Sequence, residues 1–322
     1  MNRRRFLSTL TGITAAGFGL GFGGSWLRAP QAAVDRVPTD LCLSPFSRDA
    51  LKLAQAAPLP SELTIAGSRL LKDGFLDLLA EDLHRETGQR ITVLGGGCDD
   101  GYMAAASGRA HLGNLCCPVE GSPAEKLHWI TVARDVKVVL TAPDNPVEDI
   151  RYDDLKRAFR GQITQWSELG GETRPIALIV HEHCEKTYFE PVKHLILKPG
   201  EGWSAQALYA KTDQDQLRQL LRFRSCLGIA SWVLAKPFVE RGALKALRVN
   251  GVPPSVAAAS SGDYPIVGPF NMIYSQWNDA VMRPFFDHLF GANGRRLLER
   301  TVVPLDRSQA VALSRAPELG IA

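Results

Sequence analysis

Hydrophobic and polar positions along the chain alternate in blocks that predict strands and helices in turn. A short apolar run at 63–66 predicts a strand. The segment after it repeats apolar residues at helical spacing, at Leu71, Phe75, Leu78 and Leu79. Gly88 ends this predicted helix, and the apolar run at 91–94 predicts the next strand.

The same alternation continues through most of the chain. Residues 99–107 follow a glycine turn and predict a helix, and apolar runs at 110–115, 137–141, 176–180 and 227–232 predict strands. Strands and helices that alternate at this spacing indicate an α/β protein with parallel, helix-covered sheets. Ligands of such sheets bind beyond the carboxyl ends of the strands, so the residues at those ends are the candidates for a site.

The first 61 residues differ from this pattern. Residues 3–5 are three consecutive arginines, and a weakly apolar run rich in Gly and Ala follows them. Residues 1–33 therefore resemble a twin-arginine export signal. Residues 34–61 contain several prolines and predict an extended leader. Residues 29–33 form no clean cleavage motif, so release and membrane tethering both remain open. No later run reaches the roughly 18 apolar residues of a membrane span, so we expect no transmembrane core.

Composition narrows the function classes. A net charge of +3 over 322 residues, with no dense basic tract after the first few residues, argues against a nucleic-acid partner. The chain has six cysteines, which in an exported protein are enough for three disulfide bonds. Sequence alone does not decide which of them are paired.

Several segments resemble the phosphate-binding, PstS-like branch of the periplasmic solute-binding proteins. Residues 160–171 (RGQITQWSELGG) match that family's G-x-I-x-x-W-x-x-x-G-G segment, and 95–101 and 108–113 are similar to its GGGSxxG and GxADIG segments. Residues 144–146 and 262–265 resemble its hinge and return segments. The resemblance implies a type II fold of two lobes joined by a two-strand hinge. Lobe 1 would comprise 62–140 and 265–322, and lobe 2 would comprise 141–264.

The differences from the family fall in the segments that hold its ligand. Cys98 replaces the serine of the glycine loop, His111 replaces the acid of ADIG, and Cys116-Cys117 stand where the family has an SSR-like stretch. In 181–187 (HEHCEKT), compared with RExxSGT, His181 replaces the arginine and Cys184 lies beside the lost serine. The candidate ligand-binding residues are therefore Cys98, Cys116, Cys117, Cys184, Ser68, His111, His181 and Thr187.

These substitutions favour a soft ligand. The loss of a guanidinium removes the usual partner of an oxyanion, and thiols bind thiophilic elements. Cys98 precedes a predicted helix, where the helix dipole favours a thiolate. Arsenite or antimonite fits, with Cys98, Cys117 and Cys184 as the metalloid ligands. The pattern resembles the arsenite-sensing AioX-like proteins, which implies a periplasmic protein that signals to a membrane sensor histidine kinase and needs no cofactor.

Other interpretations remain open. The adjacent residues Cys116 and Cys117 point opposite ways on a strand, so we expect at most one to face the ligand. Cys42 and Cys226 are expected to be buried thiols or a disulfide. Residues 181–184 imitate a zinc or copper ligand set, and the chain could also be an oxyanion receptor of an ABC transporter. Cys184 beside His183 suggests a thiol nucleophile, but neighbours in sequence seldom form a triad, so no enzyme is expected.

Overall fold

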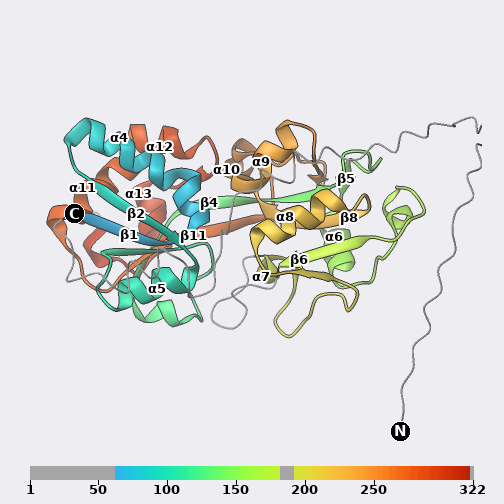
Figure 1. Cartoon of the computed structure of the whole chain (residues 1–322), viewed down its shortest axis with the longest axis horizontal. Helices are drawn as coiled ribbons and strands as arrows, with labels where there is room; N and C mark the ends of the chain where they lie inside the picture. The colour runs from blue at the N-terminus through green and yellow to red at the C-terminus, as the bar shows by residue number, and fades with distance from the viewer. Residues whose placement is uncertain (1–61, 182–191, 320–322) are drawn as a thin grey trace, which may run out of the picture.

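The computed structural model describes residues 62–181 and 192–319 and shows two lobes side by side (Figure 1). One ten-stranded sheet runs through both lobes in the order β2-β1-β3-β11-β4-β8-β6-β7, with β12 and β9 each paired to β4. The export signal, the leader, Cys42, Cys184 and Thr187 lie outside the described residues. No helix in 62–181 or 192–319 is long and apolar enough to cross a membrane.

The first lobe contains the amino-terminal strands and the carboxyl-terminal part of the chain. Its strands are β1 (Leu63–Ser68), β2 (Ile91–Gly96), β3 (Leu112–Leu115), β11 (Val267–Tyr274) and β12 (Val303–Pro304). Its helices are α3 (Arg69–Leu71), η1 (Lys72–Leu76), α4 (Asp77–Thr87), α5 (Cys98–Ala106), η2 (Pro123–Lys126), α11 (Asp279–Phe290), α12 (Ala292–Leu298), α13 (Arg307–Ala312) and η4 (Pro317–Leu319).

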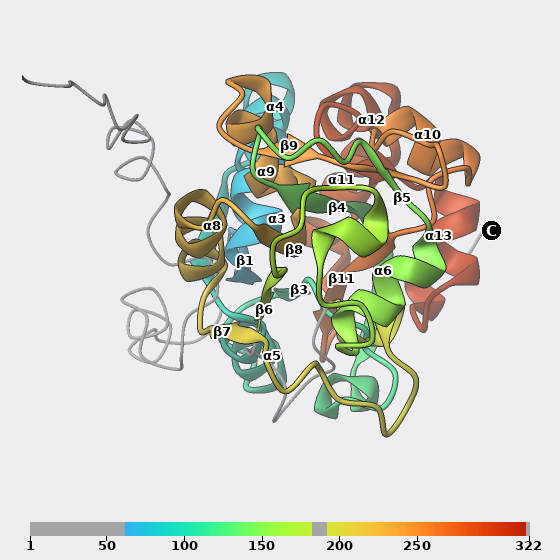
Figure 2. The ribbon, with the colours of Figure 1, turned by 90° about the vertical axis from the view of Figure 1, so that its right-hand side faces the viewer.

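The second lobe contains the elements between β4 and β11. Its strands are β5 (Asp149–Ile150), β6 (Ala177–His181), β7 (Leu208–Ala210), β8 (Cys226–Ser231), β9 (Lys245–Ala246) and β10 (Arg248–Val249). Its helices are α6 (Tyr152–Phe159), η3 (Trp166–Leu169), α7 (Lys193–Ile196), α8 (Asp213–Arg222), α9 (Trp232–Glu240) and α10 (Val256–Ser261). Seen end-on, α8 and α6 lie on opposite sides of β6 and β8 (Figure 2).

The strand β4 (His128–Thr141) belongs to both lobes. Its first part pairs with β11 and β12, and its last part pairs with β8 and β9. The return segment before β11 runs beside it, because the Lys137 N–H donates to the Ile266 carbonyl and the Tyr264 hydroxyl donates to the Lys137 carbonyl. Two neighbouring segments therefore join the lobes, which agrees with the two-strand hinge that the sequence implied.

Both halves of the sheet are mixed rather than purely parallel. β1 pairs in parallel with β2 and β3, and β6 pairs in parallel with β7 and β8. β4 and β11 are antiparallel to their neighbours; β4 runs from lobe 1 into lobe 2, and β11 returns from lobe 2 into lobe 1. The predicted α/β class is confirmed. The central strands β4 and β11 are antiparallel to their neighbours, which the periodicity of the sequence did not predict.

The core of lobe 1 follows the predicted helical pattern with one exception. Leu71, Phe75 and Leu79 are fully buried, and Phe75 packs on Phe270 of β11 with ring centroids 6.1 Å apart. The prediction for Leu78 is wrong, since 39% of this residue is exposed. The buried face of α4 includes Leu79 and Leu83, and Leu78, about 100° from Leu79 around the helix, lies at its exposed border.

Candidate functional site

Three neighbouring strands of lobe 1 end at the same edge of the sheet. Ser68 ends β1 and pairs with Gly96 of β2, and Gly67 pairs with Asn114 of β3. Because these strands are parallel, the residues that follow β2 and β3 lie beside Ser68. The chain therefore brings Ser68, Cys98 and the Cys116-Cys117 pair together at the edge where sheets of this kind bind ligands.

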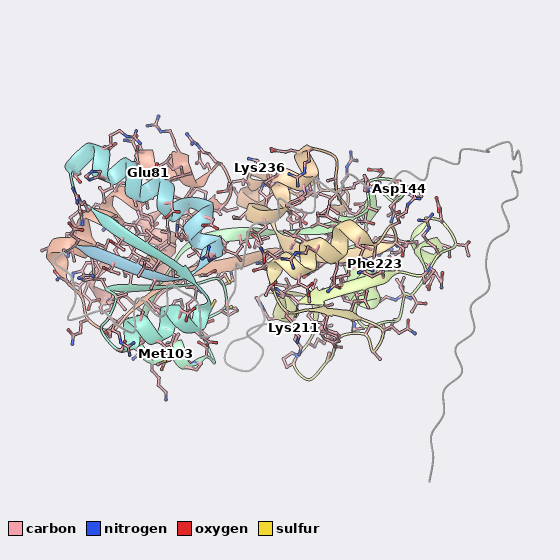
Figure 3. The ribbon with its side chains drawn as sticks, in the orientation of Figure 1. Glu81, Met103, Asp144, Lys211, Phe223 and Lys236 are labelled. Carbon is pink, nitrogen blue, oxygen red and sulfur yellow. The ribbon has the colours of Figure 1, made fainter. Side chains whose placement is uncertain are left out.

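Close packing of α5 on the sheet places Cys98. A Cβ atom on Gly101 of α5 would lie 2.8 Å from the carbonyl oxygen of Asn114, and one on Gly67, whose φ is +136°, would lie 2.2 Å from that oxygen. Only glycine fits at these two positions, so the helix begins directly against β1 and β3. Met103 on the outer side of α5 is 55% exposed, whereas Cys98 at its first turn is buried (Figure 3).

Cys98, Cys116 and Cys117 form a cluster that we call the thiol triangle. The sulfur of Cys98 lies 3.5 Å from that of Cys116 and 3.4 Å from that of Cys117, and the last two sulfurs are 4.0 Å apart. These separations exceed the about 2.05 Å of a disulfide bond, so the three sulfurs are not bonded to one another. All three residues are at most 1% exposed.

The expectation that the side chains of Cys116 and Cys117 point opposite ways is wrong. Strand β3 ends at Leu115, so the two cysteines lie past the strand, and alternation of side chains no longer applies to them. Both sulfurs lie within 3.5 Å of the Cys98 sulfur. The turn after β3 therefore supplies two thiols where the sequence pattern allowed one.

Several backbone N–H groups around the triangle already have partners within the protein. The Gly97 N–H donates to the Asp100 carboxylate at 2.8 Å, and the Leu70 N–H donates to the Ser68 hydroxyl at 3.2 Å. The Cys116 N–H donates to the Cys98 sulfur at 3.4 Å. Ser68 thus caps α3, and these three N–H groups are used by the fold.

A buried ion pair lies on β4. The Lys137 ammonium is 2.7 Å from the Asp135 carboxylate, and the two side chains are 3% and 0% exposed. Burial lowers the pKa of Lys137, but the negative charge of Asp135 and its hydrogen bond to the ammonium raise that pKa above its ordinary value. Lys137 is therefore charged, and it pairs with Ser231, the last residue of β8.

The second lobe holds a buried histidine–carboxylate pair. His181, at the end of β6, has its Nδ1 atom 3.4 Å from the carboxylate of Asp213, the first residue of α8, and both residues are buried. Lys137 pairs with Ser231 at the end of β8, and β8 is the neighbour of β6 in the sheet.

A family model described as a PBP superfamily domain matches residues 54–290. The chain belongs to this superfamily. Its curated relatives include the phosphate-binding protein PstS of Bacillus subtilis, 27% identical over 209 residues, which are 63% of this chain and 67% of that protein. The PstS of Borreliella burgdorferi is 22% identical over 174 residues, which are 52% of this chain and 62% of that protein.

Solved structures of the superfamily share the fold. A putative phosphate ABC transporter substrate-binding protein from Clostridium perfringens, with bound phosphate, aligns with a TM-score of 0.65 at 19% identity over 76% of this chain and all of that one. A phosphate transport receptor from Vibrio cholerae aligns with a TM-score of 0.59 at 21% identity over 76% of this chain and 100% of the receptor. The chain thus shares the two-lobed fold of these structures.

The triangle has the dimensions of a three-coordinate thiolate site. A circle through the three sulfur atoms has a radius of about 2.1 Å, slightly less than the about 2.3 Å of a zinc–thiolate bond. An atom bound to all three sulfurs at that bond length would lie about 0.9 Å out of their plane. That geometry is a trigonal pyramid, which suits an element with three bonds and one lone pair.

Not every residue expected at the site lies there. His111 aligns with Thr64 near the start of β1, and its Nδ1 atom accepts a hydrogen bond from the Thr64 N–H at 3.1 Å. It precedes Cys116 by five residues, roughly 16 Å along an extended strand, so its expected ligand contact is not supported. Burial lowers the pKa of His111, which keeps the ring neutral. Cys226 is a buried free thiol on β8, as expected.

Asp135, Lys137 and Asp213 are not among the residues that the sequence predicts for the site. Lys137 lies in an apolar run that predicts a strand, and Asp135 lies two residues before it. The signal was present, since two opposite charges two residues apart share one face of a strand. A charged pair at such spacing inside an otherwise apolar run predicts a buried ion pair.

Proposed function

We propose that this chain is a periplasmic solute-binding protein that captures arsenite through Cys98, Cys116 and Cys117. The observation that supports this most strongly is the triangle of three buried sulfurs, 3.4–4.0 Å apart, at the strand ends of a solute-binding fold. Three thiols at this spacing suit a trivalent, pyramidal, thiophilic centre. Antimonite has the same chemistry and belongs to the same ligand class.

The binding reaction is balanced in atoms and charge. Arsenite is the neutral trihydroxide As(OH)₃, and each hydroxyl leaves as water with the proton of one thiol while an As–S bond forms. The products are As(SR)₃ and three waters, with no net release of protons. A zinc ion bound by the same thiols would instead release their protons and leave a buried negative charge.

The phosphate alternative is supported by the relatives, two of which are named phosphate-binding proteins. The surroundings of the triangle favour a neutral ligand instead. Three N–H groups near the triangle, those of Leu70, Gly97 and Cys116, have partners in the protein. The Lys137 ammonium on β4 is paired with Asp135. A buried oxyanion needs donors and a countercharge, and these groups do not offer them.

Two further parts of the proposal rest on sequence. The twin-arginine-type signal at 1–33 supports export to the periplasm. The similarity to AioX-like proteins supports a loaded form that signals to a membrane sensor kinase regulating arsenite oxidation. Cys184, Thr187 and His181 are proposed to complete the site from lobe 2.

Calorimetry of the reduced full chain tests the ligand. We expect arsenite to bind and phosphate not to bind, and Cys98→Ala to abolish arsenite binding. The arsenite heat should be the same in two buffers of different protonation enthalpy, because no proton is released. Zn²⁺ serves as the comparison ligand, and its heat should depend on the buffer. Phosphate binding that is insensitive to Cys98→Ala would make the chain an oxyanion receptor.

A further inference from the structure

Asp135 and Lys137 occupy one face of β4 at the point where the strand passes from lobe 1 to lobe 2. Asp135 is held on two sides: its Oδ2 atom is 2.7 Å from the Lys137 ammonium, and its Oδ1 atom accepts a hydrogen bond from the Ser231 hydroxyl at 2.8 Å. All three residues are at most 3% exposed. The carboxylate is therefore fixed in position and its charge is little screened by solvent.

The Lys137 ammonium lies near the strand ends of lobe 2, because Lys137 pairs with Ser231, the last residue of β8. His181 ends the neighbouring strand β6. The ammonium is thus placed to meet an anion that binds beyond these strand ends. A lysine in such a place is a ready partner for phosphate, as a point charge.

We propose that Asp135 is a specificity-determining residue that excludes oxyanions by neutralising Lys137. The pair itself carries no net charge. A phosphate or arsenate anion that binds beside it would then lose hydration without gaining the Lys137 ammonium as a countercharge. Arsenite is a neutral trihydroxide and has no such desolvation cost. The ion pair therefore selects against charged ligands, and the thiols select for ligands that bind sulfur. This inference rests on the proposed ligand class.

Asp135→Asn tests the inference because asparagine keeps the shape of the side chain and an acceptor oxygen but removes the charge. We expect the affinities for phosphate and for arsenate each to rise at least tenfold over the wild type. Arsenite affinity should stay within about threefold, because a neutral ligand gains little from an uncovered ammonium. Calorimetry with the three ligands on the reduced full chain measures the ratio of affinities directly.

Two controls separate charge from structure. Ser231→Ala removes the other hydrogen bond of Asp135 without changing any charge, so phosphate affinity should not rise. The double variant Asp135→Asn, Lys137→Met restores a neutral pair, so the gain should disappear. Circular dichroism and thermal unfolding verify that each variant is folded. If the asparagine variant does not fold, Asp135→Ser makes the same change of charge in a smaller volume.

The outcomes distinguish this inference from the proposed function. A folded Asp135→Asn protein with no gain in phosphate or arsenate affinity overturns the inference, as does an equal gain in Ser231→Ala. Wild-type protein that binds no arsenite overturns the proposed ligand, whatever Asp135→Asn does. Wild-type arsenite binding together with a charge-dependent gain of phosphate binding in Asp135→Asn supports both.

Discussion

The thiol triangle and Cys226 are two buried cysteine sites in one sheet, and their surroundings differ. Cys98, Cys116 and Cys117 lie past strand ends and at the start of a helix. Cys226 lies within lobe 2 at the start of β8, where burial raises the pKa of its thiol to about 12. Equal burial therefore does not imply equal chemistry, and we expect the position relative to strand ends to decide which thiols bind a ligand.

The largest expected effect contrasts the two sites directly. Replacing either Cys116 or Cys117 by serine should weaken arsenite binding by about a thousandfold, about 4 kcal/mol, since one of three As–S bonds is lost. Cys226→Ala should leave the affinity within a factor of two. Calorimetry on the reduced proteins measures both. If Cys226→Ala weakened binding as much, the triangle would not be the site.

A smaller effect appears in alkaline solution. The ordinary pKa of a cysteine is about 8.5, whereas that of folded Cys226 is about 12. Between these values the unfolded chain loses the proton that the folded chain keeps. Cys226 should therefore lower the free energy of unfolding by about 1.4 kcal/mol for each pH unit above pH 9. Below pH 8 the thiol is protonated in both states, and the penalty is absent.

Urea unfolding of the wild type and of Cys226→Ala between pH 8 and pH 10.5 measures this slope. The tyrosines with raised pKa values, Tyr264 and Tyr274, titrate in both proteins and cancel in the difference. A difference in the free energy of unfolding that does not change with pH would show that Cys226 has an ordinary pKa in the folded protein.

The smallest effect concerns the helix start that carries the triangle. Asp100→Ala removes the carboxylate that accepts the Gly97 N–H. We expect a loss of about 1 kcal/mol in the free energy of unfolding, as for other capping residues. Arsenite affinity should change less than fivefold, because the sulfurs stay in place. Asp99→Ala on the same turn is the matched control for the loss of a charge. A hundredfold loss of arsenite affinity in Asp100→Ala would mean that Asp100 acts in binding.

Much of the fold was predictable because its local signals agree with its packing. Gly88 ends α4 in the left-handed conformation, with φ of +77°, and α5 covers nearly the predicted residues. The topology of parallel strands places Ser68, Cys98 and Cys116 at one edge of the sheet. Leu78 was misplaced because the pattern of apolar residues was wider than the buried face.

The rest of the site depended on contacts between residues far apart in the chain. The role of His111 was not predictable, because its partner Thr64 lies 47 residues away and holds it near the start of β1. Lys137 looks unfavourable in a buried strand until Asp135, Ser231 and the second lobe surround it. The contribution of both Cys116 and Cys117 depended on where β3 ends, and strand ends are poorly defined by sequence.

The shared strand β4 also bears on how the molecule unfolds. Strands β11 and β12 pair with the first part of β4, and strands β8 and β9 pair with its last part. If β4 leaves the sheet of one lobe, the strands of the other lobe therefore lose hydrogen-bond partners as well. The two lobes should thus behave as one cooperative unit in denaturant rather than as independent domains. The amides in the middle of β4 should exchange their hydrogens only through global unfolding.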